Sequence, residues 1–521
     1  MWFALLLSCV RPPPTAAPPL GCTLLTVNDT YRIEEVLPGV GGMARLRALR
    51  ASIEAEGQEV LLLHGGDLLF PSLQSRLSKG AHMVEVLNGL DGDPEAMDPR
   101  MLVVFGNHEF DDARWKHAPA LRQRLDDSQF LWLGSNIRFG SSPEHGGLSS
   151  PQLRDTATVD CGGLKLGLFG LTLSSKHPEY VDAFDEPVEV ARRRTQDLRA
   201  AGVDRVIALT HQTLEQDTVM VATLGAQGPD LVIGGHEHDW KQVEVEGRMV
   251  LKADADLRTA WRVDLVRGSA GVELRPRLLR LDAQAPPDPA LAARVAALLA
   301  AHAAEFCGDQ GADCLDREVG RSRVDLVAEE LTIRRYETNL GNWVADLARA
   351  ADPGADIAFL NSGGLRLNRD IAAGPITRRE IEETFAFASP LVRIELDGAT
   401  LQQVLDRSVH DWTGNGHWLQ ISGLAFVHDP ATGTASRLTL LSTGERIQPE
   451  QRLVAVVPSF LVDPSIGDQD GYTMLSGGTA LGVDLKDLVL AALADAGEGI
   501  APAKEGRICT AGAEGPCLAA P

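Results

Sequence analysis

Five short apolar runs in the first half of the chain each end in Asp, Asn or His, mostly preceded by glycine. The clearest run covers residues 101–105 and is followed by Gly106-Asn107-His108-Glu109. Amphipathic stretches separate the runs, and strands that alternate with helices predict a layered α/β fold. In open α/β sheets the ligand site lies outside the carboxyl ends of the strands, so we expect the five polar clusters to meet at one edge. The clusters are Asn28-Asp29, Gly65-Gly66-Asp67, Gly106-Asn107-His108-Glu109 with Asp111 beyond it, His211, and Gly234-Gly235-His236-Glu237-His238.

The side chains in these clusters are carboxylates, an amide and imidazoles, which suit zinc, manganese or iron rather than a thiolate-bound metal. Each cluster is a weak signal alone, because a lone histidine after a strand is usually a satisfied core residue. His64, inside an apolar run, is expected to be of that ordinary kind. The joint occurrence and order of the clusters predict a metal site.

The net charge of −23 narrows the classes of partner. A protein this acidic repels nucleic acid and anionic membrane surfaces. A small anionic substrate remains compatible with this charge if metal ions reverse the field locally. With 521 residues, two or more domains are expected.

The first ten residues, MWFALLLSCV, are too short to span a bilayer. They resemble the end of a bacterial export signal with a lipobox, in which Cys9 would carry the lipid. No Lys or Arg precedes the apolar run, unlike in a signal peptide, so a misassigned start and a frayed tail are the alternatives. The sequence RPPPTAAPPLG then predicts an extended spacer. We expect an exported protein of the periplasm or cell envelope, with Cys9 as its only membrane contact.

The cysteine count also favours export. Seven cysteines are present, and an even six remain if Cys9 is lipidated, which suits an oxidising compartment. Local disulfides are expected within two pairs that are close in sequence, and the last two cysteines would form the third pair. The alternative is six unrelated thiols in a cytosolic protein. The expected pairs are Cys307 with Cys314, Cys509 with Cys517, and Cys22 with Cys161.

Composition and periodicity divide the chain into four segments. Residues 1–22 form the signal-like segment and spacer, and residues 23–285 carry the strand–helix alternation. Residues 286–320 contain an Ala-rich helical run, PALAARVAALLAAHAAEF, which we expect to be a linker helix. Residues 321–521 show a second α/β pattern and end in a Gly/Ala/Pro tail.

The motifs GGD, GNHEFD, the histidine after IALT, and GGHEHD, in this order, resemble those of the calcineurin-like metallophosphoesterases. The resemblance continues into the second half, so the chain resembles the bacterial 5′-nucleotidases, which include periplasmic UDP-sugar hydrolases and 2′,3′-cyclic-nucleotide phosphodiesterases. It covers about residues 23–480. It implies a four-layer αββα metallophosphoesterase domain, the linker helix and a second α/β substrate-binding domain.

The resemblance implies a site for two divalent ions, such as zinc, manganese, cobalt or magnesium. Asp29, Asp67 and His238 would hold one ion. Asp67 would bridge to the other, which would be held by Asn107, His211 and His236. Such ions lower the pKa of bound water toward about 7 and polarise phosphoryl oxygens. His108 would stabilise the developing charge and protonate the leaving oxygen, with Asp111 orienting it.

One position departs from the family pattern. The family usually has Asp-x-His at the first strand, with both residues as ligands, whereas this chain has Asp29-Thr30-Tyr31. Neutral tyrosine is a poor ligand for a divalent ion, although the segment resembles a subgroup with Asn-Asp-x-Tyr here. We expect an intact but altered first site, and the alternative is the loss of one metal.

The second domain is expected to choose the substrate. The stretches ETNLGNWVADLARAAD and FLNSGGLR resemble the family's nucleotide-binding domain, and this resemblance implies that Arg334, Asn361 and Arg366 contact the phosphate or ribose. Guanidinium groups suit that role because they bind phosphate bidentately. Phe387 and Phe460 would stack on both faces of a base, a mode that tolerates any base. Asp470 would hold the ribose hydroxyls, although the loop before it is longer than usual and Asp468-Gln469 replaces Gly-Gly. The alternative for both Phe residues is core packing.

We therefore expect a 5′-nucleotidase that releases phosphate from nucleoside monophosphates by metal-hydroxide attack. Within the same chemistry, a 2′,3′-cyclic phosphodiesterase or a UDP-sugar pyrophosphohydrolase is the alternative. From a different class, the alternative is a nucleotide-binding protein on a catalytically degenerate scaffold. Tyr31 supports that last alternative, and the intact pair of His108 and Asp111 opposes it.

Overall fold

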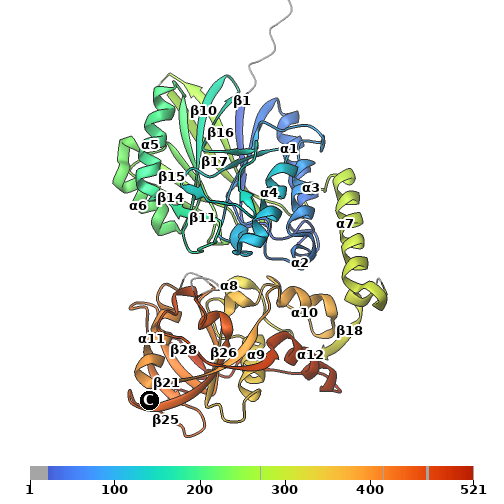
Figure 1. Ribbon diagram of the computed structural model, residues 1–521, viewed down its shortest axis with the longest axis vertical. Helices are drawn as coiled ribbons and strands as arrows, with labels where there is room; N and C mark the ends of the chain where they lie inside the picture. The colour runs from blue at the N-terminus through green and yellow to red at the C-terminus, as the bar shows by residue number, and fades with distance from the viewer. Residues whose placement is uncertain are drawn as a thin grey trace, which may run out of the picture.

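Two layered α/β units make up the protein, and the long helix α7 (Pro289–Cys307) joins them, as Figure 1 shows. The computed structural model describes residues 21–519, except 270, 312, 413, 415 and 465–468. Cys9 and the spacer before Gly21 lie outside the described residues, as does Asp468.

The first unit contains two large sheets. The seven-stranded sheet has the order β17-β16-β1-β2-β3-β4-β8 and the six-stranded sheet the order β14-β15-β13-β12-β10-β9. The first consists of β1 (Gly21–Val27), β2 (Gln58–His64), β3 (Met101–Val104), β4 (Leu131–Leu133), β8 (Leu153–Arg154), β16 (Thr259–Gly268) and β17 (Gly271–Arg280). The second consists of β9 (Thr156–Cys161), β10 (Leu164–Thr172), β12 (Arg205–His211), β13 (Leu231–Gly234), β14 (Lys241–Val245) and β15 (Arg248–Lys252). Two short antiparallel pairs, β5 (Ile137–Phe139) with β11 (Val181–Phe184) and β6 (Ser141–Ser142) with β7 (Gly146–Gly147), lie outside them.

Both faces of each large sheet are covered. Successive strand residues point to opposite faces, and Leu61 and Leu63 accordingly pack between the two sheets while Leu62 packs under the helices. The outer face of the seven-stranded sheet carries α1 (Met43–Ala55), α3 (Ala81–Asn88) and α4 (Ala118–Asp127), and that of the six-stranded sheet carries α5 (Pro187–Ala200) and α6 (Leu214–Leu224). The expected four-layer αββα arrangement is confirmed.

The parallel strands explain how the polar clusters meet. β1 pairs in parallel with β2, and β2 with β3. In the other sheet β10, β12 and β13 run parallel. Asp29, Asp67 and Asn107 therefore follow carboxyl ends in one sheet, and His211 and His236 follow or end strands in the other. The site forms where these two edges converge.

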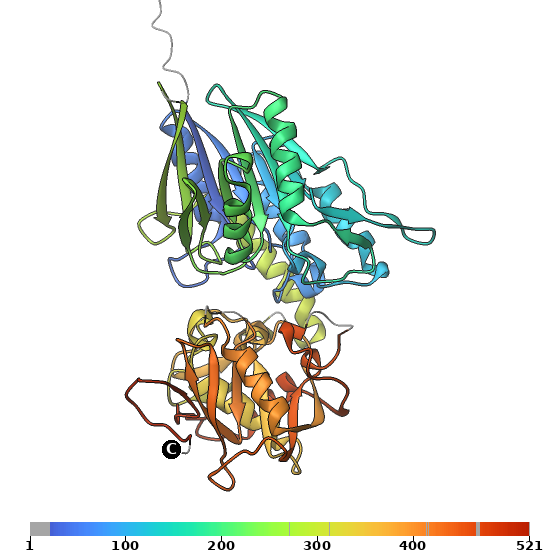
Figure 2. The same cartoon turned by 90° about the vertical axis from the view of Figure 1, so that its left-hand side faces the viewer.

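The linker helix begins as the sequence predicts. Asp288 caps α7 by accepting from the backbone N–H of Leu291, and Pro289 occupies the first turn. Leu291 and Val295 pack into the core beneath α1 and α3. Figure 2 shows α7 running down from the first unit to the second, where β18 (Glu318–Ser322) follows.

The second unit has a five-stranded sheet, β22-β19-β26-β21-β27, and a four-stranded sheet, β25-β24-β23-β28, and β18 pairs with β20 (Gly374–Thr377). The strands are β19 (Ile357–Asn361), β21 (Pro390–Asp397), β22 (Leu419–Ser422), β23 (Leu424–Asp429), β24 (Thr434–Leu440), β25 (Glu445–Arg446), β26 (Arg452–Pro458), β27 (Thr479–Asp484) and β28 (Ile508–Thr510). The helices are α8 (Glu330–Ile333), α9 (Asn339–Ala350), α10 (Arg378–Thr384), α11 (Gly398–Val409) and α12 (Leu485–Asp495). In Figure 1, α8 and α10 lie at the edge that faces the first unit, opposite α2 (Ser75–Ser78).

All three expected disulfides are present, which confirms the pairing. Cys22–Cys161 spans 139 residues and ties β1 to β9, in the two different sheets. Cys307–Cys314 and Cys509–Cys517 close short loops. Disulfides of this number are typical of proteins that fold in an oxidising compartment.

Candidate metal centre and interdomain cleft

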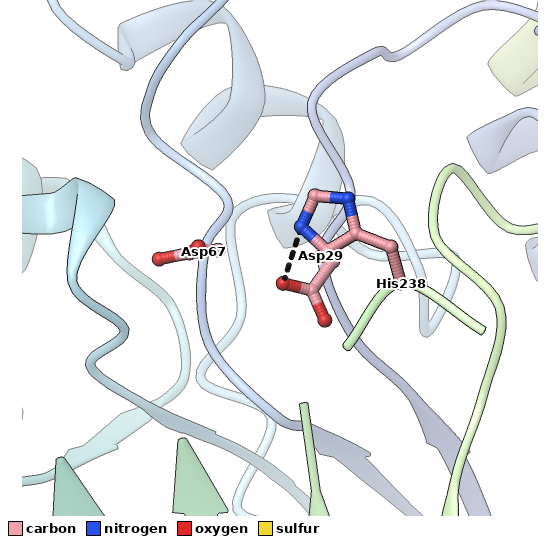
Figure 3. Close-up of side chains that lie close together, drawn as sticks. All are labelled: Asp29, Asp67 and His238. Carbon is pink, nitrogen blue, oxygen red and sulfur yellow. Dashed lines mark ion pairs between the residues drawn. The ribbon is translucent and has the colours of Figure 1, made fainter. Parts of the chain in front are cut away.

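Asp29, Asp67 and His238 form the most compact group of donors. Each offers a ligand atom, and these atoms lie within 4.8 Å of one another. Figure 3 shows the His238 ring facing the carboxylate of Asp29, with 3.4 Å between Nε2 and Oδ1. All three side chains are buried. The strand-end pattern thus brings together side chains that lie far apart along the chain.

A second group lies beside Asp67. His211 Nε2 is 3.3 Å from Asp67 Oδ2 and 3.2 Å from Asn107 Oδ1. His211 Nδ1 lies 2.7 Å from the Gly65 carbonyl oxygen, which can only accept, so Nδ1 donates and Nε2 faces the other donors. The His236 ring lies 5.3 Å from the His211 ring, centroid to centroid. All six expected metal ligands therefore gather at one edge, with Asp67 between the two groups.

Glycines allow the close approach of the loops. A Cβ on Gly106 would lie 2.1 Å from Asp67 Oδ1, and one on Gly66 would lie 2.7 Å from His211 Nδ1. Gly66 also has a φ of 87°, which side chains rarely adopt. Neither position could carry a side chain without displacing a donor.

Glu109 fixes the loops from beneath. Its carboxylate accepts from the backbone N–H groups of Asp67 at 3.0 Å and Gly106 at 2.6 Å, and also from those of Leu68 and Leu69. One carboxylate therefore ties the loop after β2 to the loop after β3. The glutamate of the GNHE motif is structural in this protein.

Lys252 ties together the two histidine-bearing loops of the six-stranded sheet, as Glu109 ties together the loops of the seven-stranded sheet. Its buried ammonium lies 2.6 Å from Glu237, 3.0 Å from Asp217 and 2.7 Å from the Gln212 carbonyl oxygen. Glu237 separates His236 from His238, and Gln212 follows His211. This buried cluster joins the two histidine-bearing loops. The sequence signal that could have revealed this cluster is the lone Lys at the end of the apolar strand β15.

The electrostatics favour a cation. Burial alone would raise the pKa of Asp29, but the charges of His238 and His211 lower it to about 2. Burial would likewise raise the pKa of Asp67, while His211 and His108 lower it well below its usual value. Two ionised carboxylates are thus buried beside positively charged histidines, and a bound cation would supply that compensating charge when the imidazoles act as neutral ligands. The donor set of carboxylate oxygens, an amide oxygen and imidazole nitrogens fits a divalent metal.

His108 and Asp111 form a pair at the rim of this group. His108 Nδ1 is 2.9 Å from Asp111 Oδ2, and Nε2 is 4.0 Å from Asp67 Oδ2. Burial would raise the pKa of Asp111, but His108 and Lys176 lower it, so the carboxylate is ionised. The arrangement holds Nδ1 as the donor and directs Nε2 toward the cleft.

The second unit reaches this rim through Arg366 and Phe387. Arg366 donates to His108 Nε2 at 2.8 Å, and its guanidinium lies 5.0 Å above the Tyr31 ring and 5.7 Å from that of Phe387. The half-buried Phe387 ring is 6.1 Å from the ring of His108. Two of the predicted substrate residues therefore touch the predicted catalytic histidine.

The other predicted substrate residues lie deeper in the second unit. Asn361 donates to Asp470 Oδ2 at 2.9 Å, so the long loop brings two of the predicted substrate residues together. Arg334 is buried and forms an ion pair with Glu330. Phe460 is half-buried beside the hydrophobic core of the second unit. Among the described residues, no contact joins Phe460 to the metal edge.

Glu330 is a site residue that the sequence did not reveal. It lies on α8 with Oε1 2.9 Å from His238 Nδ1 and 3.8 Å from Arg366 Nη1. Burial lowers the pKa of His238, but the charges of Glu330 and Asp29 raise it to about 9. A carboxylate from one unit thus contacts a candidate metal ligand in the other. No local motif marks such a contact.

Ion pairs close the cleft between the units around this site. Arg32 pairs with Glu383 at 2.9 Å, Arg76 on α2 pairs with Glu382 on α10 at 2.5 Å, and Asn368 donates to Asp256 at 2.9 Å. Residues of both units, among them Tyr31, Glu330 and Arg366, line the remaining space. The structure is therefore a docked state in which the second unit covers the metal edge.

His64 proves to be an ordinary core residue, as expected. Its Nε2 lies 2.6 Å from Thr30 Oγ1, and its Nδ1 accepts from the backbone N–H of Gly66. Burial lowers its pKa to about 4.

Comparisons with known proteins agree with this geometry. Residues 22–240 match the calcineurin-like phosphoesterase family, and residues 318–477 match the 5′-nucleotidase C-terminal domain. The snake venom 5′-nucleotidase of Naja atra is 27% identical, covering 87% of this chain and 92% of its own length. The 5′-nucleotidase of Mus musculus is 24% identical over 91% of this chain and 87% of its own length.

The fold has a close counterpart among solved structures. A 5′-nucleotidase precursor from Thermus thermophilus superposes with a TM-score of 0.78 at 24% identity, over 95% of this chain and 100% of that one. The expected resemblance is confirmed: the chain belongs to the 5′-nucleotidase family, as a metal-dependent phosphoric ester hydrolase with a calcineurin-like phosphoesterase domain and a 5′-nucleotidase C-terminal domain.

Proposed function

We propose that this protein hydrolyses nucleoside 5′-monophosphates to nucleoside and phosphate with two divalent ions. The observation that carries the proposal is the position of His108. It pairs with Asp111, lies 4.0 Å from Asp67, and contacts both Arg366 and Phe387 of the second domain. A proton-transfer group, a metal ligand, a phosphate-binding guanidinium and a stacking ring thus converge on one space.

The metal roles follow from the two donor groups. Asp29, Asp67 and His238 would hold one ion, and Asp67, Asn107, His211 and His236 the other, with Asp67 shared. Bound ions of this kind supply an activated water and Lewis-acid polarisation of the phosphoryl group. Zinc, manganese, cobalt and magnesium all accept such donors.

The chain's own residues carry out the remaining chemistry. His108 Nε2 accepts from Arg366 in this structure, and once Arg366 turns away this nitrogen can carry the proton that the leaving ribose oxygen needs, while Asp111 keeps Nδ1 as the donor on the other side of the ring. Arg366, which contacts Nε2 in this structure, turns its guanidinium to the phosphoryl oxygens when substrate enters. Asn361 and Asp470 bind the ribose end, Arg334 the phosphate end, and Phe387 and Phe460 the base.

An exported location would suit this role. Three disulfides and similarity to a venom enzyme support an exported protein. An extracytoplasmic nucleotidase would meet nucleotides outside the cytosol. We place the enzyme in the periplasm or cell envelope, with Cys9 as a candidate lipid attachment.

Phosphate release from AMP tests the proposal. The protein is first stripped of metal, then assayed in metal-free buffer and with manganese, zinc, cobalt or magnesium restored. UDP-glucose, 2′,3′-cyclic AMP and an aryl phosphate serve as comparison substrates. We expect metal-dependent turnover with AMP as the preferred substrate.

Two other results would contradict the proposal. Faster turnover of UDP-glucose or of the cyclic nucleotide would assign the site to a pyrophosphohydrolase or phosphodiesterase. Nucleotide binding without turnover under any metal would assign it to a binding protein.

A further inference from the structure

Tyr31 occupies an unexpected place for a residue that replaces a ligand. Its side chain is 8% exposed, and its hydroxyl oxygen points into the group formed by Asp29, Asp67 and His238. The oxygen lies 2.9 Å from His238 Nε2, 3.0 Å from Asp67 Oδ2 and 3.4 Å from Asp29 Oδ1. It therefore contacts one atom of every candidate ligand of the first ion.

These distances match those within a coordination sphere. Donor atoms that bind one ion at about 2.1 Å are separated from one another by about 3.0 Å in octahedral and about 3.4 Å in tetrahedral geometry. The three hydroxyl contacts fall between 2.9 and 3.4 Å, and the Nε2 of His238 lies 3.4 Å from Oδ1 of Asp29. Four of the six distances among these atoms thus match those between donors to a shared ion, and the ligand atom of Asp67 lies within 4.8 Å of those of Asp29 and His238.

Hydrogen bonds account for two of the three contacts: Nε2 of His238, whose pKa is raised to about 9, donates to the Tyr31 oxygen, and the Tyr31 hydroxyl donates to Asp67 Oδ2. A hydroxyl has one proton to donate, yet two carboxylate oxygens and an imidazole nitrogen surround it. A cation among them would satisfy all four lone pairs at once. The guanidinium of Arg366, 5.0 Å from the Tyr31 ring, adds positive charge on the cleft side.

The position of the ring is also well defined. The backbone N–H of Tyr31 donates to Asp256 Oδ1 at 3.1 Å, and the ring contacts those of His108 at 5.9 Å and His238 at 5.4 Å. The hydroxyl is thus held in place by packing on several sides, as a preformed ligand would be.

We propose that the Tyr31 hydroxyl oxygen is the fourth protein donor of the first metal position. That position then has three oxygen donors and one imidazole, and it favours a hard, highly charged cation such as ferric iron over zinc, so that a trivalent ion would take the place of one of the two divalent ions proposed above. On binding, the Tyr31 O–H bond breaks, its electron pair goes to the cation and its proton to solvent, with no change of oxidation state. The inference rests on the proposed metal centre, and it specifies how the first site, expected to be intact but altered, differs from the family pattern.

Visible spectroscopy of the iron-loaded protein tests this inference. The full chain is stripped with a chelator, then reloaded with zinc and ferric citrate and desalted, and its metal content is measured on the same sample. Ferric iron bound to a phenolate absorbs visible light by charge transfer, whereas carboxylate and imidazole ligands alone do not produce that band. We expect one iron per chain and a visible band.

Variants assign the band to one side chain. Tyr31→Phe and Tyr31→His are expected to lose it, and Tyr31→His is expected to bind zinc in place of iron at the first position. The chain has only four tyrosines, and Tyr180→Phe is the matched control, because Tyr180 is also buried but bonds to the Asp112 carbonyl oxygen. That variant keeps the band. Tyr31→His serves if Tyr31→Phe does not fold.

Several results would overturn the inference: no iron uptake by the wild-type protein, iron bound without the band, or a band that survives in either Tyr31 variant. Failure of the proposed function looks different. In that case the wild-type protein retains no divalent metal and releases no phosphate from AMP. If only the role of Tyr31 is wrong, metal-dependent phosphate release persists without the band.

Discussion

At the scale of single residues, the metal-site side chains stand on unusual backbone. Asp29, Asp67, His236 and His238 have φ values of 50°, 58°, 91° and 63°. Left-handed backbone costs a non-glycine residue roughly 1–3 kcal/mol, and it persists where the surroundings impose it. Glu109 and Lys252 supply that constraint here. The sequence predicted these residues as ligands from their type and order, but no local pattern could reveal the turns that orient their side chains.

The role of His108 can be tested by a single substitution. Replacing it by Ala removes the proposed proton donor but no metal ligand, so we expect kcat for AMP to fall about 10²–10⁴-fold with metal content unchanged. Steady-state kinetics and metal analysis of the same preparation measure both effects. Asp111→Asn keeps a polar partner for Nδ1 but removes its charge. We expect its kcat to lie between those of the wild-type protein and His108→Ala. Unchanged turnover in His108→Ala would remove the residue from the mechanism.

Phe387 and Phe460 can be separated from core residues by substrate choice. If they stack on the base, Phe387→Ala and Phe460→Ala raise KM for AMP by roughly ten-fold or more, since stacking contributes about 1–3 kcal/mol per base. KM for an aryl phosphate, which lacks the nucleoside, stays nearly constant. Parallel losses on both substrates, together with a lower melting temperature, would mean that the rings only pack the core.

At the scale of elements, hydrophobic periodicity and the polar residues at strand ends predicted most of the helices and strands discussed here. The Ala-rich run after Asp288 predicts a helix, and α7 covers Pro289–Cys307. The run before the GNHE motif predicts a buried strand, and β3 covers Met101–Val104. Helix α8 was not foreseen, because its four residues are too few to show a period and it owes its start to a cap, Glu329, which accepts from Leu331 and Thr332. Its contact with His238 depends on docking between distant parts of the chain.

That contact makes α8 a testable element. We expect Glu330→Gln to weaken binding of the first metal about 10–100-fold, because carboxylates that orient a ligating histidine contribute that much to affinity. Calorimetric titration of the stripped protein with the metal measures it. Glu330→Asp should recover part of the loss, whereas Glu329→Gln, on the adjacent cap residue, should bind metal normally. An unaltered dissociation constant in Glu330→Gln would show that His238 needs no partner from the second unit.

At the scale of the whole molecule, the two units share one site but touch mainly through charged groups. Arg32–Glu383 and Arg76–Glu382 close the cleft, and α7 provides the covalent connection. Composition predicted the two units, and family resemblance predicted their roles. The docked arrangement itself comes from pairs of charges on surfaces that no sequence pattern relates.

The packing of α7 against the first unit gives the protein a pH dependence. Burial, with the nearby charges of His302 and Arg124, lowers the pKa of His82 on α3 from 6.5 to about 3. The folded protein therefore keeps His82 neutral, while the unfolded chain takes up a proton below pH 6.5. Stability that is fully present above pH 6.5 is lost as the pH falls toward 3, at up to about 1.4 kcal/mol per pH unit.

Thermal unfolding between pH 8 and 4.5 measures this loss. His82→Asn, which cannot titrate, should flatten the fall in melting temperature between pH 6.5 and 5. The exposed His177→Asn should reproduce the wild-type curve. An equally steep fall in His82→Asn would assign the acid sensitivity to other groups.

The direction of strand β1 determines how the enzyme would be oriented if it were attached to a surface through the residues before Gly21. Its carboxyl end delivers Asp29 to the cleft, so its first residue, Gly21, lies about 20 Å away at the opposite edge of the sheet. The Cys22–Cys161 bridge clamps that far end to the second sheet. A mechanical force applied through a tether ahead of Gly21 would act on the Cys22–Cys161 disulfide before it reached the loops that carry the candidate metal ligands. The cleft between the two units would then lie on the side of the first unit opposite the point of attachment.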